Sequence, residues 1–133
     1  LLELGFDDTA PNQPVDISSW AYDYAIAYVK GIDDNRAKGV LCYLPEYTFV
    51  EKLQTISTKY RQYKDGREFP KNFLRHYYDV YCLLDCPSVL EFIETDRYQT
   101  RKAERFPKSD NLNISQNSAF LLSDSEDRKL FES

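Results

Sequence analysis

The chain of 133 residues contains no methionine, a single histidine and only four glycines. The missing methionine includes position 1, and the opening residues 1–5 (LLELG) have the character of a strand that is already under way. We therefore expect the sequence to be part of a longer protein. No apolar run approaches the roughly 20 residues of a membrane-spanning helix, and no signal peptide opens the chain. We therefore expect a cytoplasmic protein without a membrane partner.

The sequence has little cysteine, in an arrangement that excludes two common uses. The three cysteines, Cys42, Cys82 and Cys86, are odd in number and contain no C-x-x-C pair. A structural zinc site needs four Cys or His ligands at short paired spacings, and a disulfide framework needs an even set. Free thiols agree with a reducing cytoplasm. Cys82 and Cys86 lie four residues apart on an expected helix, where we interpret them as buried small apolar residues.

The charge is acidic overall but unevenly distributed. The net charge is -5, and residues 1–23 hold five acids and no base. Residues 52–75 hold seven bases against two acids, and residues 97–108 hold five bases against one acid. Two interpretations stay open. The basic segments are either the solvated faces of ordinary helices or a local positive field suited to phosphate groups.

Periodicity predicts an α+β fold that is mostly helical, with two short strands near the N-terminus. The strands are expected at 1–5 and 39–44, joined by a turn-rich connection at 7–14 and a helix at 19–30 with the apolar residues Trp20, Tyr24 and Tyr28. Further helices are expected at 45–63, 71–84, from 87, 95–106 and 124–131, with a polar loop at 108–118. Apolar residues recur at helical spacing on the two longest helices: Phe49, Leu53, Ile56, Tyr60 and Tyr63, and then Phe73, Tyr77, Val80, Tyr81 and Leu84.

Charged residues on the two longest helices could carry chemistry. Lys52 and Lys59 are nearly two turns apart and therefore share a face. Arg75 and Asp79 are four residues apart and can pair, with His76 beside them. A positive row next to a carboxylate could hold a triphosphate and accept a hydroxyl proton. The alternative is a pair of ordinary amphipathic helices with exposed lysines.

Three segments of the sequence resemble motifs of one family. Residues 44–53 (LPEYTFVEKL) resemble its PERTFWEKL segment, residues 75–81 (RHYYDVY) resemble its RHYYDLY helix, and residues 2–5 (LELG) resemble its KLEFG strand. The family is the bacterial AbiEii/AbiGii-type nucleotidyltransferases, the toxins of abortive-infection or type IV toxin–antitoxin systems. The resemblance covers roughly residues 1–85. It implies that residues 1–44 end an α/β nucleotidyltransferase portion with its connecting helix, and that residues 45–133 form a C-terminal helical portion.

The resemblance also implies roles for single residues. The family's K-L-x-A-L-x-x-R motif falls on Lys52, the phosphate-contacting and catalytic lysine, and on Lys59, which replaces an arginine. Its R-x-x-K-D-x-x-D motif begins at Asn72, a departure, and ends at Asp79, the candidate base or base-orienting carboxylate. Within this motif Arg75 and His76 are implied to bind the nucleotide. Glu3, on the first strand, is the candidate metal ligand.

One family motif is missing. The chain has no Gly-Ser dipeptide, and its nearest approach to D-x-D, residues 124–126 (DSE), is wrongly placed for the family's Mg²⁺-binding motif. We therefore expect a C-terminal fragment that would not catalyse alone. The whole protein would use Mg²⁺ to transfer a nucleotide from an NTP to an RNA (a tRNA, for example) or protein acceptor, as a toxin countered by an antitoxin. The rival interpretation is a non-catalytic helical module that binds RNA or an antitoxin-like protein through its basic segments.

Overall fold

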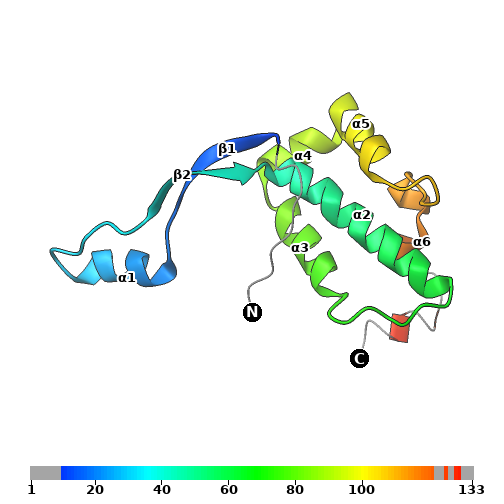
Figure 1. Cartoon of the computed structure of the whole chain (residues 1–133), viewed down its shortest axis with the longest axis horizontal. Coiled ribbons are helices and arrows are strands. Elements are labelled where there is room, and N and C mark those ends of the chain that lie inside the picture. Colours follow the sequence, from blue (N-terminus) through cyan, green and yellow to red (C-terminus); the bar gives the residue numbers. More distant parts are fainter. Residues whose placement is uncertain (1–9, 122–124, 126–127, 130–133) are drawn as a thin grey trace. The chain divides into compact units, whose positions relative to one another are not determined.

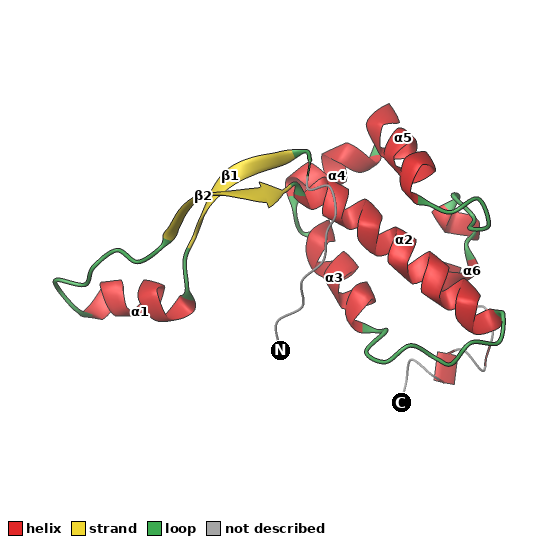
Figure 2. Cartoon of the chain, in the orientation of Figure 1, coloured by secondary structure: helices red, strands yellow, loops and turns green. Residues whose placement is uncertain are grey.

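The structure, a computed structural model, describes residues 10–121, 125 and 128–129. Within these residues six α-helices, one 3₁₀ helix and a two-stranded antiparallel sheet make an α+β fold that is mostly helical, which confirms the predicted class (Figure 2). The chain divides into two compact units, Leu1–Leu44 and Pro45–Ser133. We call them the hairpin unit and the helical unit.

The sheet of the hairpin unit pairs β1 (Asn12–Ile17) with β2 (Ala37–Tyr43). The strand β2 confirms the one expected at 39–44, whereas the strand expected at 1–5 lies outside the described residues. The prediction of a turn-rich connection up to residue 14 is wrong, because Asn12 onward forms β1. Both strands of a two-stranded sheet are edges, where Pro14 is tolerated, and proline therefore did not end the extended segment as expected.

The helix of the hairpin unit, α1 (Trp20–Tyr28), lies between the two strands in the chain. The Ser19 side chain caps it by accepting a hydrogen bond from the backbone N–H of Tyr22. None of residues 10–44 is buried, and Trp20 is 85% exposed. The hairpin unit itself therefore does not cover the apolar residues predicted for this helix.

The helical unit is built around α2 (Pro45–Lys64), which contacts four other helices (Figure 1). These are α3 (Arg75–Leu84), α4 (Pro87–Ile93), α5 (Asp96–Arg105) and the short α6 (Ser118–Leu121), which follows the 3₁₀ helix η1 (Ile114–Gln116). The turn after α2 contains Gly66 with a φ of 96°, which glycine adopts without steric cost. The helix expected at 124–131 falls largely outside the described residues.

Two buried clusters hold the helical unit together. Their residues are Phe49, Val50, Leu53, Val89, Phe92, Tyr98 and Phe106 in the first, and Ile56, Tyr60, Phe73 and Ala119 in the second. The predicted stripe of α2 supplies residues to both clusters, which confirms it as the core-facing side of the helix. No helix formed by the described residues is long and apolar enough to cross a membrane.

The helix α3 differs from its prediction at its start and on its outer side. It begins at Arg75 instead of residue 71, because Asn72 has a φ of 56°, which an α-helix does not accommodate. Tyr81 is 65% exposed, and Leu84 and Cys82 are exposed as well, contrary to the expectation that they are buried. Periodicity marks the apolar residues of α3, but packing against α2 leaves these three side chains exposed.

Candidate functional site

Two cross-helix contacts join α2 to α3. The Nζ of Lys52 lies 2.7 Å from Oδ2 of Asp79, and the Nζ of Lys59 lies 3.2 Å from Nε2 of His76. The two lysines therefore share the face of α2 that meets α3, as their spacing predicts. The order of the contacts is reversed along the two helices. The earlier lysine of α2, Lys52, contacts the later residue of α3, Asp79, and Lys59 contacts the earlier one, His76. This arrangement places two ammonium groups, one carboxylate and one imidazole along a single seam.

The Lys52–Asp79 contact is an ion pair at the rim of the seam. The side chains of Lys52 and Asp79 are 31% and 38% exposed. The hydrogen bond from Lys52 lowers the pKa of the Asp79 carboxyl, with smaller contributions from the nearby His76 and Arg75. Asp79 is therefore ionised at neutral pH and still reachable from solvent. A partly exposed pair of this kind contributes only about 0–1 kcal/mol to stability.

His76 is the buried member of the seam, with 6% of its surface exposed. Burial lowers the pKa of its imidazole, and the positive charges of Lys59, Lys52 and Arg75 lower it further. Among the described residues that act on it, Asp79 has the opposite effect and raises this pKa. His76 is therefore neutral at physiological pH.

A shallow cleft of about 300 Å³ opens beside the ion pair. It is lined by Thr48, Lys52, Asp79, Cys82 and Leu83. Sequence reasoning missed Thr48 and Cys82 as candidates. The signal was available, because Thr48 precedes Lys52 by four residues and Cys82 follows Asp79 by three, so each lies on the same helix face as the charged residue.

The ion pair expected between Arg75 and Asp79 is not formed in the structure. Asp79 pairs with Lys52 and not with Arg75, because its carboxylate meets the lysine across the helix interface instead of its neighbour one turn back. Arg75 is exposed and acts on His76 and Asp79 only through its charge. Glu3, the candidate metal ligand, lies outside the described residues.

The described residues do not fit a magnesium site. Within 10–121, 125 and 128–129, no three acidic, histidine or cysteine side chains cluster closely enough to hold a metal ion. Asp79 is a lone carboxylate whose nearest charged partner is an ammonium, the opposite of a cation-binding environment. The charged groups that the described residues bring together at this seam are therefore the side chains of α2 and α3.

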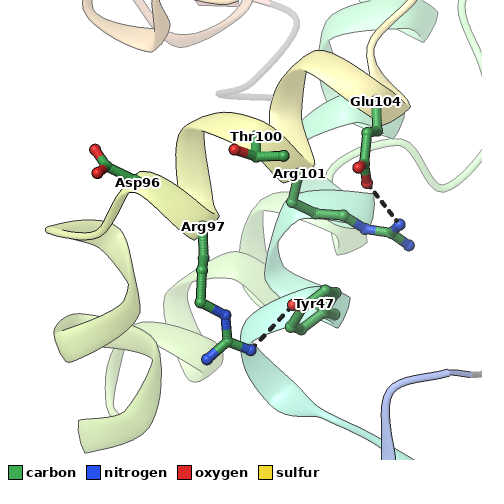
Figure 3. A pocket seen from close by; sticks show the side chains of 6 residues that line it. All are labelled: Tyr47, Asp96, Arg97, Thr100, Arg101 and Glu104. Atoms are coloured by element: carbon green, nitrogen blue, oxygen red, sulfur yellow. Dashed lines mark hydrogen bonds and ion pairs between the residues drawn. The ribbon is translucent and has the colours of Figure 1, made fainter.

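A second open cavity lies between α2 and α5. Figure 3 shows the Tyr47 ring between the guanidinium groups of Arg97 and Arg101, whose Cζ atoms lie 5.9 and 5.3 Å from the ring centroid. Arg97 also donates to the Tyr47 hydroxyl oxygen at 3.1 Å, and Arg101 pairs with Glu104 at 3.4 Å. The contacts of Arg97 and Arg101 with Tyr47 link α5 to the first turn of α2, whereas the Arg101–Glu104 pair lies within α5.

The basic segment 97–108 is largely neutralised where it meets α2. Arg101 and Arg105 both donate to the Glu51 carboxylate, at 3.0 and 2.7 Å. Lys102 is buried over the Tyr98 ring and donates to the backbone carbonyl oxygen of Leu112. Of the two interpretations of the basic segments, the structure favours helix-stabilising contacts for this one.

A known family accounts for nearly the whole chain. The family model of the AbiEii nucleotidyl transferase toxins, of type IV toxin–antitoxin systems, matches residues 1–132. The chain belongs to this family. Neither a curated protein nor a solved structure matches it. Membership of the AbiEii family brings nucleotidyl transfer, a metal requirement and an antitoxin into consideration, and the resemblance drawn from residues 44–53 and 75–81 is confirmed.

Proposed function

We propose that the seam between α2 and α3 is the part of a nucleotidyltransferase toxin that holds an NTP and orients the hydroxyl group of an RNA or protein acceptor. The observation that carries the proposal is the Lys52–Asp79 pair, 2.7 Å apart across two helices at the edge of a cleft. Structural ion pairs also occur at helix interfaces. This one is accompanied by Lys59 and Arg75, which give the seam an excess of positive charge.

The reaction is the attack of an acceptor hydroxyl oxygen on the α-phosphorus of the NTP. A new P–O bond forms, the bond to the β-phosphate oxygen breaks, and pyrophosphate leaves. The ionised Asp79 carboxylate accepts the hydrogen bond, and then the proton, of the acceptor hydroxyl. We assign Lys52 the task of fixing Asp79 in position and keeping it ionised, because the ammonium is already held by that carboxylate.

The two units of the chain have different tasks in this function. Residues 45–133 supply the nucleotide-holding helices, and residues 1–44 belong to the α/β portion of the nucleotidyltransferase. Mg²⁺ would bind to carboxylates other than Asp79, with Glu3 as the candidate within this chain. The toxin acts in the bacterial cytoplasm, where an antitoxin protein counters it.

A transfer assay tests the roles of Lys52 and Asp79. The protein, as its gene encodes it, is incubated with labelled NTPs and total RNA or protein, and the label in the acceptor is counted. Asp79→Ala and Lys52→Ala should each reduce transfer by about 100-fold or more, as expected when a proton acceptor or its orienting group is lost. Thr55→Ala, a half-buried position of α2 outside the seam contacts, is the matched control. Transfer that persists unchanged in both variants contradicts the proposal.

The rival function is RNA binding without chemistry, through the basic segments. The neutralisation of Arg101 and Arg105 by Glu51 removes much of the positive surface that such binding needs. Electrostatic RNA binding weakens steeply with salt and does not depend on NTP. RNA binding of that kind, with no labelled nucleotide transferred by the wild-type protein, would favour the rival function.

A further inference from the structure

The two lysines of the seam have partners of different charge. Lys52 meets the Asp79 carboxylate, which is anionic, whereas Lys59 meets the His76 imidazole. An ammonium group has only donors, so Nε2 of His76 must act as the acceptor at 3.2 Å. His76 is therefore neutral and carries its proton on Nδ1. The positive charge of Lys52 is cancelled within the seam, and that of Lys59 is not.

The surroundings of the two contacts increase this difference. The charged groups that face His76 are Lys52 and Lys59 from α2, and Arg75 and Asp79 from α3. Three of these four groups are cations. The half of the seam around Lys59 therefore carries an excess of positive charge with no carboxylate of its own, which is the electrostatic requirement for binding a phosphate chain.

The tautomer of His76 that accepts from Lys59 leaves the other ring nitrogen as a buried donor. Nδ1 of His76 is buried without a hydrogen-bond partner among the described residues. A leucine of similar size would avoid this unsatisfied donor and would pack equally well beside Phe73 and the core of α2. The histidine is thus a poor choice for stability at this position, and its one polar contact is the one that holds Lys59.

On the basis of the proposed function, we propose that Lys59 is the residue that binds the triphosphate of the NTP, and that His76 is its positioning residue. Lys59 donates to the phosphate oxygens with an ammonium that no carboxylate of the described residues neutralises. His76 accepts a hydrogen bond from the Lys59 ammonium, so that the flexible side chain is already ordered before the ligand arrives. Lys52 stays with Asp79 and serves the acceptor hydroxyl.

Calorimetric titration with inorganic triphosphate (tripolyphosphate) tests this division without requiring catalysis. Lys59→Ala should weaken the binding of tripolyphosphate by at least about tenfold, the usual effect of losing a charge-assisted hydrogen bond. Lys52→Ala should weaken it by less than about threefold, because the Lys52 ammonium is already held by the Asp79 carboxylate and makes no direct contact with the phosphate chain. Binding that weakens more in Lys52→Ala than in Lys59→Ala overturns the inference, and so does the absence of binding to the wild-type chain.

Variants of His76 test the positioning role. His76→Gln retains a neutral acceptor for Lys59 and should stay within about threefold of wild-type binding. His76→Leu should weaken the binding of tripolyphosphate nearly as much as Lys59→Ala, while its melting temperature stays at or above that of the wild type. The double variant Lys59→Ala/His76→Leu should bind no more weakly than Lys59→Ala alone, since both changes remove one interaction. Additive losses, or a lowered melting temperature in His76→Leu, would show that His76 is structural.

The outcomes of the two sets of experiments are separable. If the transfer assay depends on Asp79 but tripolyphosphate binding does not depend on Lys59, the proposed function stands and the division of labour fails. If tripolyphosphate binding follows Lys59 and the wild-type protein transfers no nucleotide, the anion site stands and the proposed transfer reaction fails.

Discussion

The two flanks of α2 use charged residues in opposite ways. On the flank that meets α5, the Glu51 carboxylate receives Arg101 and Arg105, and the side chains of Arg101 and Glu51 are only 17% and 21% exposed. On the flank that meets α3, the Asp79 carboxylate neutralises Lys52, while Lys59 rests on a neutral histidine. On the first flank the arginines are held by the shared carboxylate in a partly buried interface, and the second flank is more open and carries an excess of positive charge.

This contrast separates a structural charge cluster from a candidate ligand site within one helix. Buried charges that satisfy each other make the association of α2 and α5 specific, but they leave nothing for a ligand to bind. On the α3 flank, the exposed Asp79 carboxylate and the Lys59 ammonium can each still bind a ligand group. Substitutions on the two flanks should therefore have opposite effects on stability and on ligand binding.

The largest effect on stability is expected at Glu51. In Glu51→Gln the guanidinium groups of Arg101 and Arg105 lose their shared carboxylate, and removing one member of a largely buried ion pair typically costs about 3 kcal/mol. The midpoint of urea unfolding measures this loss. Binding of tripolyphosphate by the folded fraction should not change. If Glu51→Gln leaves the stability unaltered but abolishes triphosphate binding, the functional flank is the one that meets α5.

The opposite pattern is expected on the α3 flank. Asp79→Asn should change the free energy of unfolding by less than about 1 kcal/mol, because the Lys52–Asp79 pair is partly exposed. Nucleotide transfer should nevertheless fall by about 100-fold, since an amide does not accept the acceptor proton. Urea unfolding and the transfer assay, performed on the same preparation, provide both numbers. A stability loss as large as that of Glu51→Gln would make this pair structural too.

The sequence predicted the elements of the site better than the contacts within it. The apolar stripe of α2 follows from residues such as Leu53 and Ile56, which occur at helical spacing and are buried. The partner of Asp79 was not predictable in the same way. Periodicity relates residues of one helix and suggested Arg75, whereas the true partner, Lys52, depends on the register in which two helices pack.

Two further errors have physical causes that a single sequence does not reveal. The prolines at 11 and 14 predict a turn-rich connection over 7–14, yet an edge strand tolerates Pro14, and β1 begins at Asn12. The aromatic residues of α1, including Trp20, have the spacing of a buried face, but spacing does not say what covers that face. In both cases the outcome depended on contacts between elements, namely strand pairing for Pro14 and the packing partner of α1, which a local sequence pattern does not contain.

A smaller effect on the α3 flank should appear in the pH dependence of stability. The pKa of His76 is lower in the folded protein than its ordinary value of 6.5, because burial and the adjacent lysines disfavour the imidazolium. Between these two values the unfolded chain binds a proton that the folded chain does not. Stability is therefore fully present above pH 6.5 and decreases as the pH falls toward the lowered pKa.

Melting temperatures measured between pH 8 and pH 5 would detect this decrease in the wild type and its reduction in His76→Leu. Asp79 titrates in a lower window, since its pKa is lowered from 3.8, and its contribution is lost only at more acidic pH. The two groups can thus be told apart in one series. An equal slope in both proteins would mean that His76 does not titrate differently in the folded and unfolded states.

The smallest effect is expected at Arg97, the exposed arginine of the α5 flank. Arg97→Ala removes the hydrogen bond to the Tyr47 hydroxyl and a guanidinium over the rings of Tyr47 and Phe92, contacts that contribute about 0.5 kcal/mol at an exposed site. Urea unfolding should show a decrease of that size, with transfer unchanged. RNA binding measured at several salt concentrations provides the sharper test, because a lost phosphate contact reduces the slope of log K against log salt by about 0.7 for a single strand. We expect the slope to stay the same, since the basic residues of α5 are occupied with α2. A reduced slope in Arg97→Ala would show that the α5 flank also contacts RNA, and the contrast between the two flanks would then lie in which ligand each one binds.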